Sequence, residues 1–307
     1  MPESMPQEVG EYELLEHIAT GGMADIFRAR LLAGGDLVAL KRLRPQHSEN
    51  PAFIERFVGE AKLGVKLRHP NIVRTVKLFK KGPDYFIVQE LVDGLSLAAL
   101  LNLRREMGLA LPQSATMQIL AGLLSALDYV HRAKLGETAV TIVHRDVSPG
   151  NVLVDRQGGV KLTDFGLAEA SLHPELKAER GVLAGTPAYM SPEQVVGQSL
   201  DPRSDIFSAG TLLYECLANK PPFEAEVEYD LLKLVKDAQR PPLLLEDTGV
   251  ELWEALVDRA MAPLPDDRFA TAAGFKRTLL TVGEKLGVAA DPETLAETVA
   301  AALWEPG

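Results

Sequence analysis

The sequence predicts an α+β fold in two lobes, a small β-rich lobe followed by a larger and mainly helical lobe. Three observations predict it. Short apolar runs of strand length, separated by glycine pairs, fill most of the first hundred residues. Patterns of helical period dominate after Gly94. The chain has 307 residues, more than a typical single core holds, so two lobes or two domains are expected.

The first lobe is expected to hold five strands and one helix. The strands are predicted at residues 12–18, 25–31, 37–43, 72–79 and 84–90. Asn50 and Pro51 combine an N-cap with a proline at the first helical position, so a helix starts there, and it is expected to end near His69-Pro70. Apolar and small residues share one face of this helix: Phe53, Phe57, Ala61 and Gly64.

The second lobe is expected to be built from helices around a loop-rich stretch, residues 143–193. Helices are predicted at residues 113–132, 204–218, 226–237, 251–261, 271–286 and 292–303. Within the loop-rich stretch, residues 152–155 and 160–163 read as two short strands joined by a turn at Gly158-Gly159. The segment near residues 90–95 connects the lobes and is an expected ligand position.

Composition excludes several classes of protein. The net charge of −11, from 43 acidic and 32 basic residues, argues against a nucleic-acid binder. The single cysteine, Cys216, lies in an apolar run and allows no disulfide framework, which fits a reducing compartment. The sequence has no signal-peptide pattern and no run near the ~20 apolar residues of a membrane span. We therefore expect a cytoplasmic, soluble protein.

Two motifs carry the strongest chemical signal: His144-Arg145-Asp146-Val147-Ser148-Pro149-Gly150-Asn151 and Asp164-Phe165-Gly166. They resemble the catalytic loop and the magnesium-binding triplet of protein kinases, in the manner of the eukaryotic-like (Hanks-type) serine/threonine kinases of bacteria. The resemblance covers roughly residues 12–281. It implies a two-lobed protein-kinase fold, with a small antiparallel β-sheet N-lobe at 12–91 and a C-lobe at 92–281. Residues 1–11 would be an N-terminal tail and 282–307 a C-terminal helical extension.

The resemblance implies a role for each polar residue of these motifs. Asp146 would accept or orient the proton of the substrate hydroxyl, with Arg145 before it. Asn151 and Asp164 would supply oxygen ligands to Mg²⁺, or to Mn²⁺, that accompanies ATP. The alternative is two unrelated acidic surface turns, and two motifs in order at the family spacing argue against it.

Lys41 and Glu60 are expected to form an ion pair. Lys41, in Val38-Ala39-Leu40-Lys41, matches the lysine that contacts the α- and β-phosphates, although such a lysine alone is most often a solvated strand residue. Glu60 lies three residues after Phe57, on the apolar face of the predicted helix. A carboxylate there is costly without a partner, and Lys41 is the partner that the family implies.

The loop that would cover the nucleotide departs from the family pattern Gly-x-Gly-x-x-Gly. Ala19 and Ala24 stand at the first and third glycine positions, and the added methyl groups are expected to narrow or stiffen the approach to phosphate. The resemblance implies nucleotide contacts from Ile18, Ala19, Thr20, Gly21, Gly22, Met23, Ala24, Ile26, Ala39, Lys41, Glu90, Val92 and Leu153. Plain core packing is the alternative for the apolar members, and both can hold together.

Downstream residues resemble the part of the family that docks a peptide. Thr186, in the segment 185–193, is typical of serine/threonine specificity. Glu193 matches the acid that pairs with a late arginine, here Arg268, and Asp205 matches the buried acid that holds the catalytic-loop backbone.

Three departures affect activity or regulation. Ser148 replaces the usual lysine two residues after the catalytic aspartate, which removes one charge contact to the γ-phosphate. Ser171 is the only hydroxyl residue between Gly166 and Gly185, so we expect Glu175 or Glu179 to supply a standing negative charge. Gly64 replaces a bulky apolar residue, which is expected to loosen the hydrophobic stack that links the lobes.

The sequence thus predicts a serine/threonine protein kinase acting on protein substrates, with a regulatory protein as a further partner. The rival is a pseudokinase or scaffold without catalysis, suggested by Ala19, Ala24 and Ser148. Against it, every expected catalytic and metal residue is intact: Lys41, Glu60, Asp146, Asn151 and Asp164. A kinase directed at small molecules is disfavoured by Thr186 and the predicted Glu193–Arg268 pair.

Overall fold

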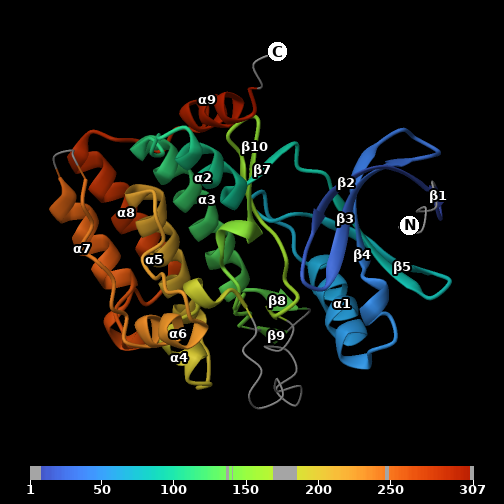
Figure 1. Ribbon diagram of the computed structural model, residues 1–307, viewed down its shortest axis with the longest axis horizontal. Coiled ribbons are helices and arrows are strands. Elements are labelled where there is room, and N and C mark those ends of the chain that lie inside the picture. The colour runs from blue at the N-terminus through green and yellow to red at the C-terminus, as the bar shows by residue number, and fades with distance from the viewer. Residues whose placement is uncertain (1–7, 136–137, 140, 169–184, 246–248, 305–307) are drawn as a thin grey trace. The chain divides into compact units, whose positions relative to one another are not determined.

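The computed structural model describes residues 8–135, 138–139, 141–168, 185–245 and 249–304 (Figure 1). The chain divides into two compact units, residues 1–92 and 93–307. This boundary lies one residue from the predicted lobe boundary.

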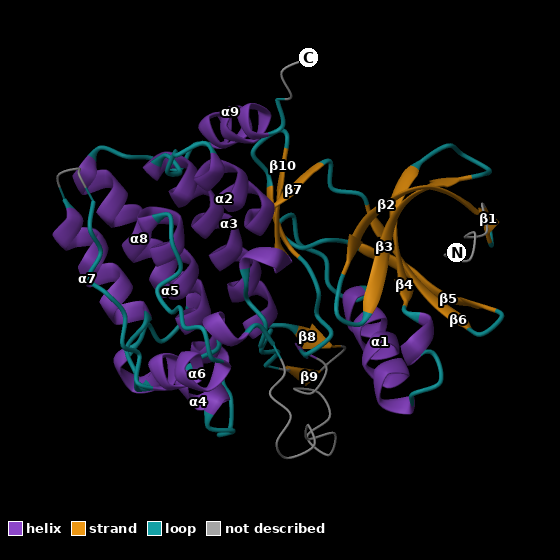
Figure 2. Cartoon of the chain, viewed as in Figure 1, coloured by secondary structure: helices purple, strands orange, loops and turns teal. Residues whose placement is uncertain are grey.

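The N-terminal unit is an antiparallel sheet with one helix, as predicted (Figure 2). Six strands lie in the order β1-β2-β3-β4-β6-β5. They span Glu8–Val9 (β1), Tyr12–Thr20 (β2), Ala24–Leu31 (β3), Leu37–Leu43 (β4), Thr75–Lys81 (β5) and Asp84–Glu90 (β6). β1 comes from the segment expected to be a tail, and its Val9 pairs with Tyr12 and is buried. β5 starts three residues later than predicted, since Ile72 forms only an isolated bridge and Val73 is buried without strand pairing.

Helix α1 (Pro51–Gly64) packs against the sheet of this unit. The Asn50 side chain accepts a hydrogen bond from the Ala52 amide at 3.0 Å, which is the cap that the sequence predicted. Phe57 and Ala61 of the helix share a hydrophobic cluster with residues of β4 and β6. This cluster fixes the helix over the strand that carries Lys41.

The C-terminal unit is mainly helical (Figure 1). Its helices are α2 (Leu97–Glu106), α3 (Gln113–His131), α4 (Pro192–Val195), α5 (Pro202–Ala218), α6 (Glu228–Lys236), α7 (Val250–Ala260), α8 (Ala272–Leu286) and α9 (Pro292–Ala302). Its strands are β7 (Gly94–Ser96), β8 (Lys134–Leu135), β9 (Thr138–Ala139), β10 (Val152–Asp155) and β11 (Val160–Leu162). Helices α3 and α5 form the core of this unit, and nearly all residues of α5 are buried.

Helix α9 packs on the C-terminal unit through contacts with α2, α3 and β10. Leu295 and Val299 are fully buried in that contact. Gly158, with a φ of +77°, sits against the carbonyl of Pro292, where any side chain would clash. The predicted C-terminal extension is therefore an integral layer of this unit.

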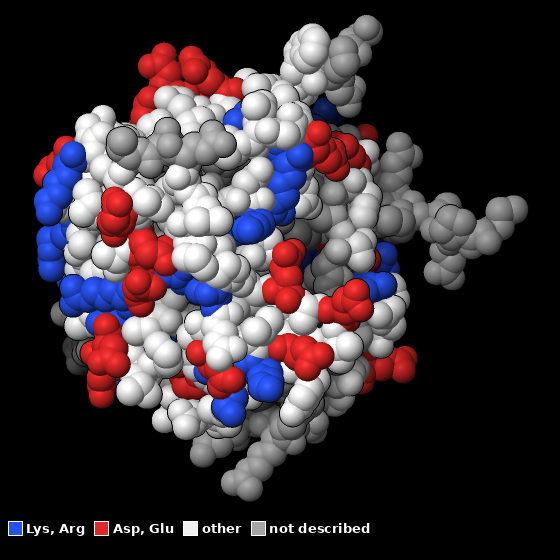
Figure 3. All heavy atoms as spheres, turned by 60° about the vertical axis from the view of Figure 1, so that its left-hand side comes forward, with Lys and Arg blue, Asp and Glu red and all other residues white. Residues whose placement is uncertain are grey.

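The surface mixes charges of both signs. Figure 3 shows Lys and Arg side chains interspersed with Asp and Glu on the face in view, rather than gathered in one basic patch. Among the described helices, none has the length and apolar character needed to span a membrane.

Candidate active site

Lys41 and Glu60 form a buried ion pair in the N-terminal unit. Lys41 Nζ donates to Glu60 Oε1 at 2.7 Å and to Oε2 at 2.8 Å. The two residues are only 5% and 2% exposed. Charges buried this deeply persist only when they are paired. The predicted pair is formed, and its role toward a nucleotide stays a prediction.

The predicted nucleotide-covering loop is the turn between β2 and β3. The Gly21 amide donates to the Ala24 carbonyl at 2.8 Å and closes the turn. Thr20 Oγ1 donates to Asp25 Oδ1 at 2.9 Å and ties the two strands below it. A side chain built on Gly22 would meet no atom within 4 Å, so the tip is open. Met23 completes the turn and is half-buried.

The two alanines in glycine positions have different surroundings. Ala24 is only 2% exposed and packs in the cluster with Leu43 and Phe57. Ala19 is exposed on β2, beside Ile18, which is also exposed. The methyl group of Ala24 therefore packs in the core. Of the two alanine methyl groups, only the one of Ala19 is exposed on the surface of the hairpin.

The residues predicted to surround the adenine are divided between the two units. Ile26 and Ala39 are half-buried on β3 and β4. Glu90 ends β6, and its amide donates to the Arg74 carbonyl at 2.9 Å. Val92 is the last residue of the N-terminal unit. Leu153 lies on β10 of the C-terminal unit, where it pairs with Ser96 and Lys161.

The catalytic-loop backbone in the C-terminal unit is held by Asp205 of α5. Its Oδ2 accepts from the His144 amide at 2.8 Å and its Oδ1 accepts from the Arg145 amide at 2.9 Å. Asp205 also contacts His131 Nε2 at 2.8 Å. Burial raises the pKa of Asp205, but the hydrogen bonds from His131 and from the His144 amide outweigh it and hold the pKa below its ordinary value.

His144 links the catalytic loop to the segment before Asp164. The Asp146 amide donates to His144 Nδ1 at 3.3 Å, so that Nδ1 is the acceptor nitrogen and Nε2 carries the hydrogen. Nε2 lies 3.1 Å from the Thr163 carbonyl, which accepts that hydrogen. The ring also meets Phe165 edge-on at 4.8 Å. These contacts bring the two motifs together.

The Asp146 carboxylate accepts hydrogen bonds on both oxygens. Asn151 Nδ2 donates to Oδ2 at 2.9 Å. The amide and the hydroxyl of Thr186 both donate to Oδ1, each at 2.9 Å. Asp146 is thus oriented from the catalytic loop on one side and from the 185–193 segment on the other.

Of the two residues predicted to bind metal, Asn151 ends the catalytic-loop motif and Asp164 follows strand β11. Asn151 Nδ2 donates to the carbonyl as well as to the carboxylate of Asp146, so the ligand that Asn151 can offer is Oδ1. The Thr163 amide, one residue before Asp164, donates to the Asn151 carbonyl at 2.9 Å. Asp164 has a left-handed backbone, with φ of 62°, which aspartate tolerates better than most residues.

The remaining catalytic-loop residues are held by contacts of other kinds. Arg145 has a left-handed φ of 70°, and its carbonyl accepts from Gln194 Nε2 at 2.8 Å. Burial lowers the pKa of the Arg145 guanidinium, and Asp205 partly opposes this. Ser148 is buried at the start of the turn that ends in Asn151. The residues expected to regulate the loop, Ser171, Glu175 and Glu179, lie outside the described residues.

Glu193 and Arg268 form the second predicted ion pair. Arg268 NH1 and NH2 donate to the Glu193 carboxylate at 2.7 and 2.8 Å. Ser204 Oγ donates to the same carboxylate at 2.7 Å. The pair joins α4, which follows the 185–191 segment, to the loop between α7 and α8.

Comparison with known proteins agrees with this geometry. A family model described as a protein kinase domain matches residues 12–269. The chain belongs to the protein kinase family. It is 36% identical over 280 residues to the tyrosine-protein kinase MasK of Myxococcus xanthus, covering 90% of this chain and 43% of MasK.

Bacterial relatives named as serine/threonine kinases match this kinase to a similar degree. A probable serine/threonine-protein kinase PknB of Bifidobacterium longum is 34% identical over 298 residues, covering 92% of this chain and 41% of the relative. The serine/threonine-protein kinase PknL of Mycobacterium tuberculosis is 34% identical over 278 residues, covering 90% and 67%. The kinase therefore spans less than half the length of MasK and of PknB.

Membership of the family implies the use of ATP and a divalent cation. The residues present fit both groups. Asn151 and Asp164 offer hard oxygen ligands, which Mg²⁺ prefers, and Lys41 offers a buried cation to phosphate.

Sequence reasoning identified Asp205 but missed several residues that support the candidate site. One is His131 on α3, which contacts Asp205 on α5, and no local pattern connects the two. Tyr189 donates to Glu215 Oε2 at 2.6 Å, and Arg105 pairs with the other oxygen of Glu215. Contacts between residues 26 to 110 positions apart leave no periodicity or motif in the sequence.

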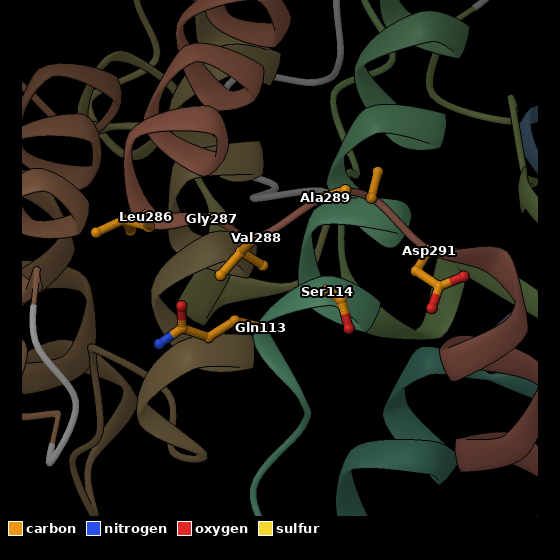
Figure 4. A pocket seen from close by; sticks show the side chains of 8 residues that line it. Gln113, Ser114, Leu286, Gly287, Val288, Ala289 and Asp291 are labelled. Atoms are coloured by element: carbon orange, nitrogen blue, oxygen red, sulfur yellow. The ribbon is translucent and has the colours of Figure 1, made fainter.

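An open groove of about 720 Å³ lies in the C-terminal unit between the start of α3 and the α8–α9 connection (Figure 4). Gln113 and Ser114 line it from α3, and Leu286, Val288 and Asp291 from the connection. None of the predicted site residues lines this groove. Its polar groups serve the fold, since Asp291 caps α9 and Gln113 accepts from Trp253 Nε1 at 3.2 Å.

Proposed function

We propose that this chain is a serine/threonine protein kinase that transfers the γ-phosphoryl group of Mg-ATP to hydroxyl groups of proteins. The observation that carries the proposal is the Asp146 carboxylate. It lies on a loop anchored to α5 and is oriented by Asn151 and Thr186 at hydrogen-bonding distance. Positioning of this kind supplies most of the catalysis of phosphoryl transfer.

Each residue then has a distinct role. Bound Mg-ATP supplies the phosphoryl group, and the cation neutralises phosphate charge. Asn151 and Asp164 hold the cation through oxygen atoms, and Lys41, kept in place by Glu60, pairs with phosphate oxygens. Asp146 orients the substrate hydroxyl and takes up its proton. The small Ser148 in the usual lysine position makes the charge contacts of Lys41 and the cation more important here.

The preference for serine and threonine rests on Thr186. Its hydroxyl donates to the same Asp146 oxygen as its own amide, which fixes the 185–191 segment beside the catalytic carboxylate. One of the similar relatives is named a tyrosine kinase, so the acceptor residue must be measured and not assumed.

The test is transfer of labelled γ-phosphate to the chain itself and to a generic basic protein, followed by identification of the labelled amino acid. We expect phosphoserine and phosphothreonine from the wild type and no label from Asp146→Asn. Stabilisation by Mg-ATP serves as the folding control for the variant. A wild type that is stabilised by ATP and transfers nothing would instead support the pseudokinase, and label on tyrosine would reject the serine/threonine assignment.

We further propose Mg²⁺ as the working cation, the cytoplasm as the compartment, and a regulatory protein as a partner. The hard oxygen donors of Asn151 and Asp164 support the first proposal. The lone Cys216 is fully buried, and burial raises its pKa, so it takes no part in disulfide chemistry, which suits a reducing compartment.

A further inference from the structure

Gly64 closes α1 at the point where the helix comes nearest to the sheet of the N-terminal unit. Gly64 is buried, and Thr75, the first residue of β5, is 3% exposed. A Cβ added to Gly64 would overlap Thr75 Oγ1 and lie 3.0 Å from Thr75 Cβ. The contact with Oγ1 is shorter than real side chains show and the contact with Cβ is tight, so a residue larger than glycine requires the Thr75 side chain, the helix or the strand to shift.

Thr75 and Lys41 present the same face of the sheet to α1. Thr75 pairs with Gln89 of β6, and Gln89 pairs on its other side with Ala39 of β4. Lys41 is two residues after Ala39, and side chains two residues apart in a strand point to the same face. The helix therefore meets this face at two places, through Glu60 and through Gly64.

On the helix, the two contact points are one turn apart. Glu60 and Gly64 are separated by four residues, or about 6 Å along the axis, so they lie on the same side of α1. The ion pair of Glu60 is bidentate, with distances of 2.7 and 2.8 Å. A helix pushed away from Thr75 cannot keep both of these distances.

We propose that the lack of a side chain at Gly64 lets α1 close on Thr75 and so sets the position of α1 and, through Glu60, the position of Lys41. Gly64 is a positioning residue that acts on phosphate binding without touching the nucleotide, and Thr75 is only the side chain that a larger residue at position 64 would meet. The proposal rests on the proposed kinase function for its activity readout. Its structural part concerns only the N-terminal unit and is measured separately. It also explains how the helix is held without the bulky side chain that the family usually places at this position.

The first experiment compares Gly64→Ala, Thr75→Ala and the double variant of the full chain in phosphoryl transfer. Gly64→Ala is expected to lower kcat/KM for ATP by about tenfold or more, since small misplacements of catalytic groups have effects of this size. Thr75→Ala removes the nearest atom and is expected to retain activity. The double variant is expected to recover most of the loss. Gly34→Ala is the matched control, because its nearest neighbour is an ordinary 3.7 Å away.

The second experiment asks whether Gly64 acts through Glu60. In a Glu60→Gln background, Gly64→Ala is expected to cause little further loss of activity, because the pair it disturbs is already broken. Equal losses in both backgrounds, or a Gly64→Ala variant as active as Gly34→Ala, would overturn the proposal.

Amide hydrogen exchange gives a readout that does not depend on catalysis. Gly64→Ala is expected to speed exchange in α1, with β3 and β4 unchanged, and Thr75→Ala is expected to reverse the effect. If the wild type transfers no phosphate but α1 responds in this way, the proposed function fails and the positioning contact stands. If α1 exchange is unchanged in Gly64→Ala, the contact does not position the helix.

Discussion

Buried charges organise this kinase at the scale of single residues. Lys41, Glu60, Glu193, Asp205 and Arg268 are each at most 5% exposed, and each is paired. Pairs at such depth stabilise a protein little compared with apolar residues of the same volume. Each pair includes or anchors a residue or segment that the sequence predicts to be functional, namely Lys41, the loop of Asp146 and the 185–193 segment, so we infer that the pairs serve geometry rather than stability.

Variants of the Lys41–Glu60 pair are expected to change the stability of the protein and its transfer activity independently. Glu60→Ala leaves the Lys41 charge buried and alone, and is expected to lower the free energy of unfolding by about 3–5 kcal/mol. Replacing both residues, Lys41→Met with Glu60→Leu, is expected to restore or exceed wild-type stability while phosphoryl transfer remains absent. Urea unfolding and a transfer assay on the same samples make the comparison. An active double variant would show that the pair is dispensable for catalysis.

Thr186 should matter through its hydroxyl. Thr186→Val keeps the shape of the side chain but removes the hydrogen bond to the charged Asp146. Such a bond contributes about 1.5–3 kcal/mol, so kcat is expected to fall about 10- to 100-fold. Thr186→Ser keeps the hydroxyl and should stay within a few-fold of the wild type. Steady-state kinetics on one protein substrate measure kcat for the three proteins. Equal kcat values for the valine and serine variants would contradict this role.

At the scale of elements, one ion pair joins segments that are distant in the sequence. Glu193 lies in the first turn of the short helix α4 and Arg268 lies between α7 and α8, yet they share two hydrogen bonds. Burial alone raises the pKa of Glu193, but the hydrogen bond and charge of Arg268 outweigh it and lower the pKa below its ordinary 4.5. A carboxyl with a lowered pKa stabilises the fold above its unfolded-state pKa and loses that contribution as pH falls through its folded-state pKa.

The pH dependence of stability should therefore differ between the wild type and Glu193→Gln. We expect the wild type to have a higher free energy of unfolding than Glu193→Gln. This difference should be largest above about pH 5 and should decrease toward pH 3. Glu11, Asp205 and Asp291 also have lowered pKa values, none of them attributed to Arg268, so their contributions are common to both proteins and cancel in the comparison. Unfolding curves at several pH values measure the margin. A margin that does not change with pH would mean that the carboxyl has no lowered pKa.

Most elements followed from local sequence patterns, and the exceptions have physical reasons. The periodic helices α3, α5 and α8 lie within a residue or two of their predicted bounds, whereas α1 starts at the predicted Pro51 but ends at Gly64, short of the predicted end near His69-Pro70. Helix α2 was not predicted, although Ser96 caps it and Leu97, Leu100 and Leu101 are buried on one face. The two-residue strands β1, β8 and β9 are too short for any periodicity to reveal, and pairing with a neighbour defines them.

At the scale of the whole chain, the folded C-terminal unit continues past the family match, which ends at residue 269. Helices α8 and α9 follow, and α9 buries Leu295, Thr298 and Val299 against the unit. The segment that the sequence set apart as an extension is packed like a core element.

Helix α9 should accordingly support stability without affecting chemistry. Leu295→Ala removes a fully buried side chain and is expected to lower the free energy of unfolding by about 2–5 kcal/mol. The exposed Glu297 on the same helix provides the control, and Glu297→Ala should change stability by no more than about 0.5 kcal/mol. Transfer rates well below the melting temperature should match the wild type in both variants. An unchanged melting temperature for Leu295→Ala would show that α9 is not bound to the unit in solution.

The sequence by itself determined the fold class, the family and the identity of the candidate catalytic residues. It could do so because Asp146, Asn151 and Asp164 lie in short motifs, and because helical spacing alone placed Glu60 on a buried face. Only the tertiary structure decided which atoms meet: His131 with Asp205, Thr186 with Asp146, Ala24 with the core, and Gly64 with Thr75. Periodicity and motifs report the face on which a residue lies, whereas a contact between distant residues depends on how closely two elements pack, and packing distance leaves no local pattern.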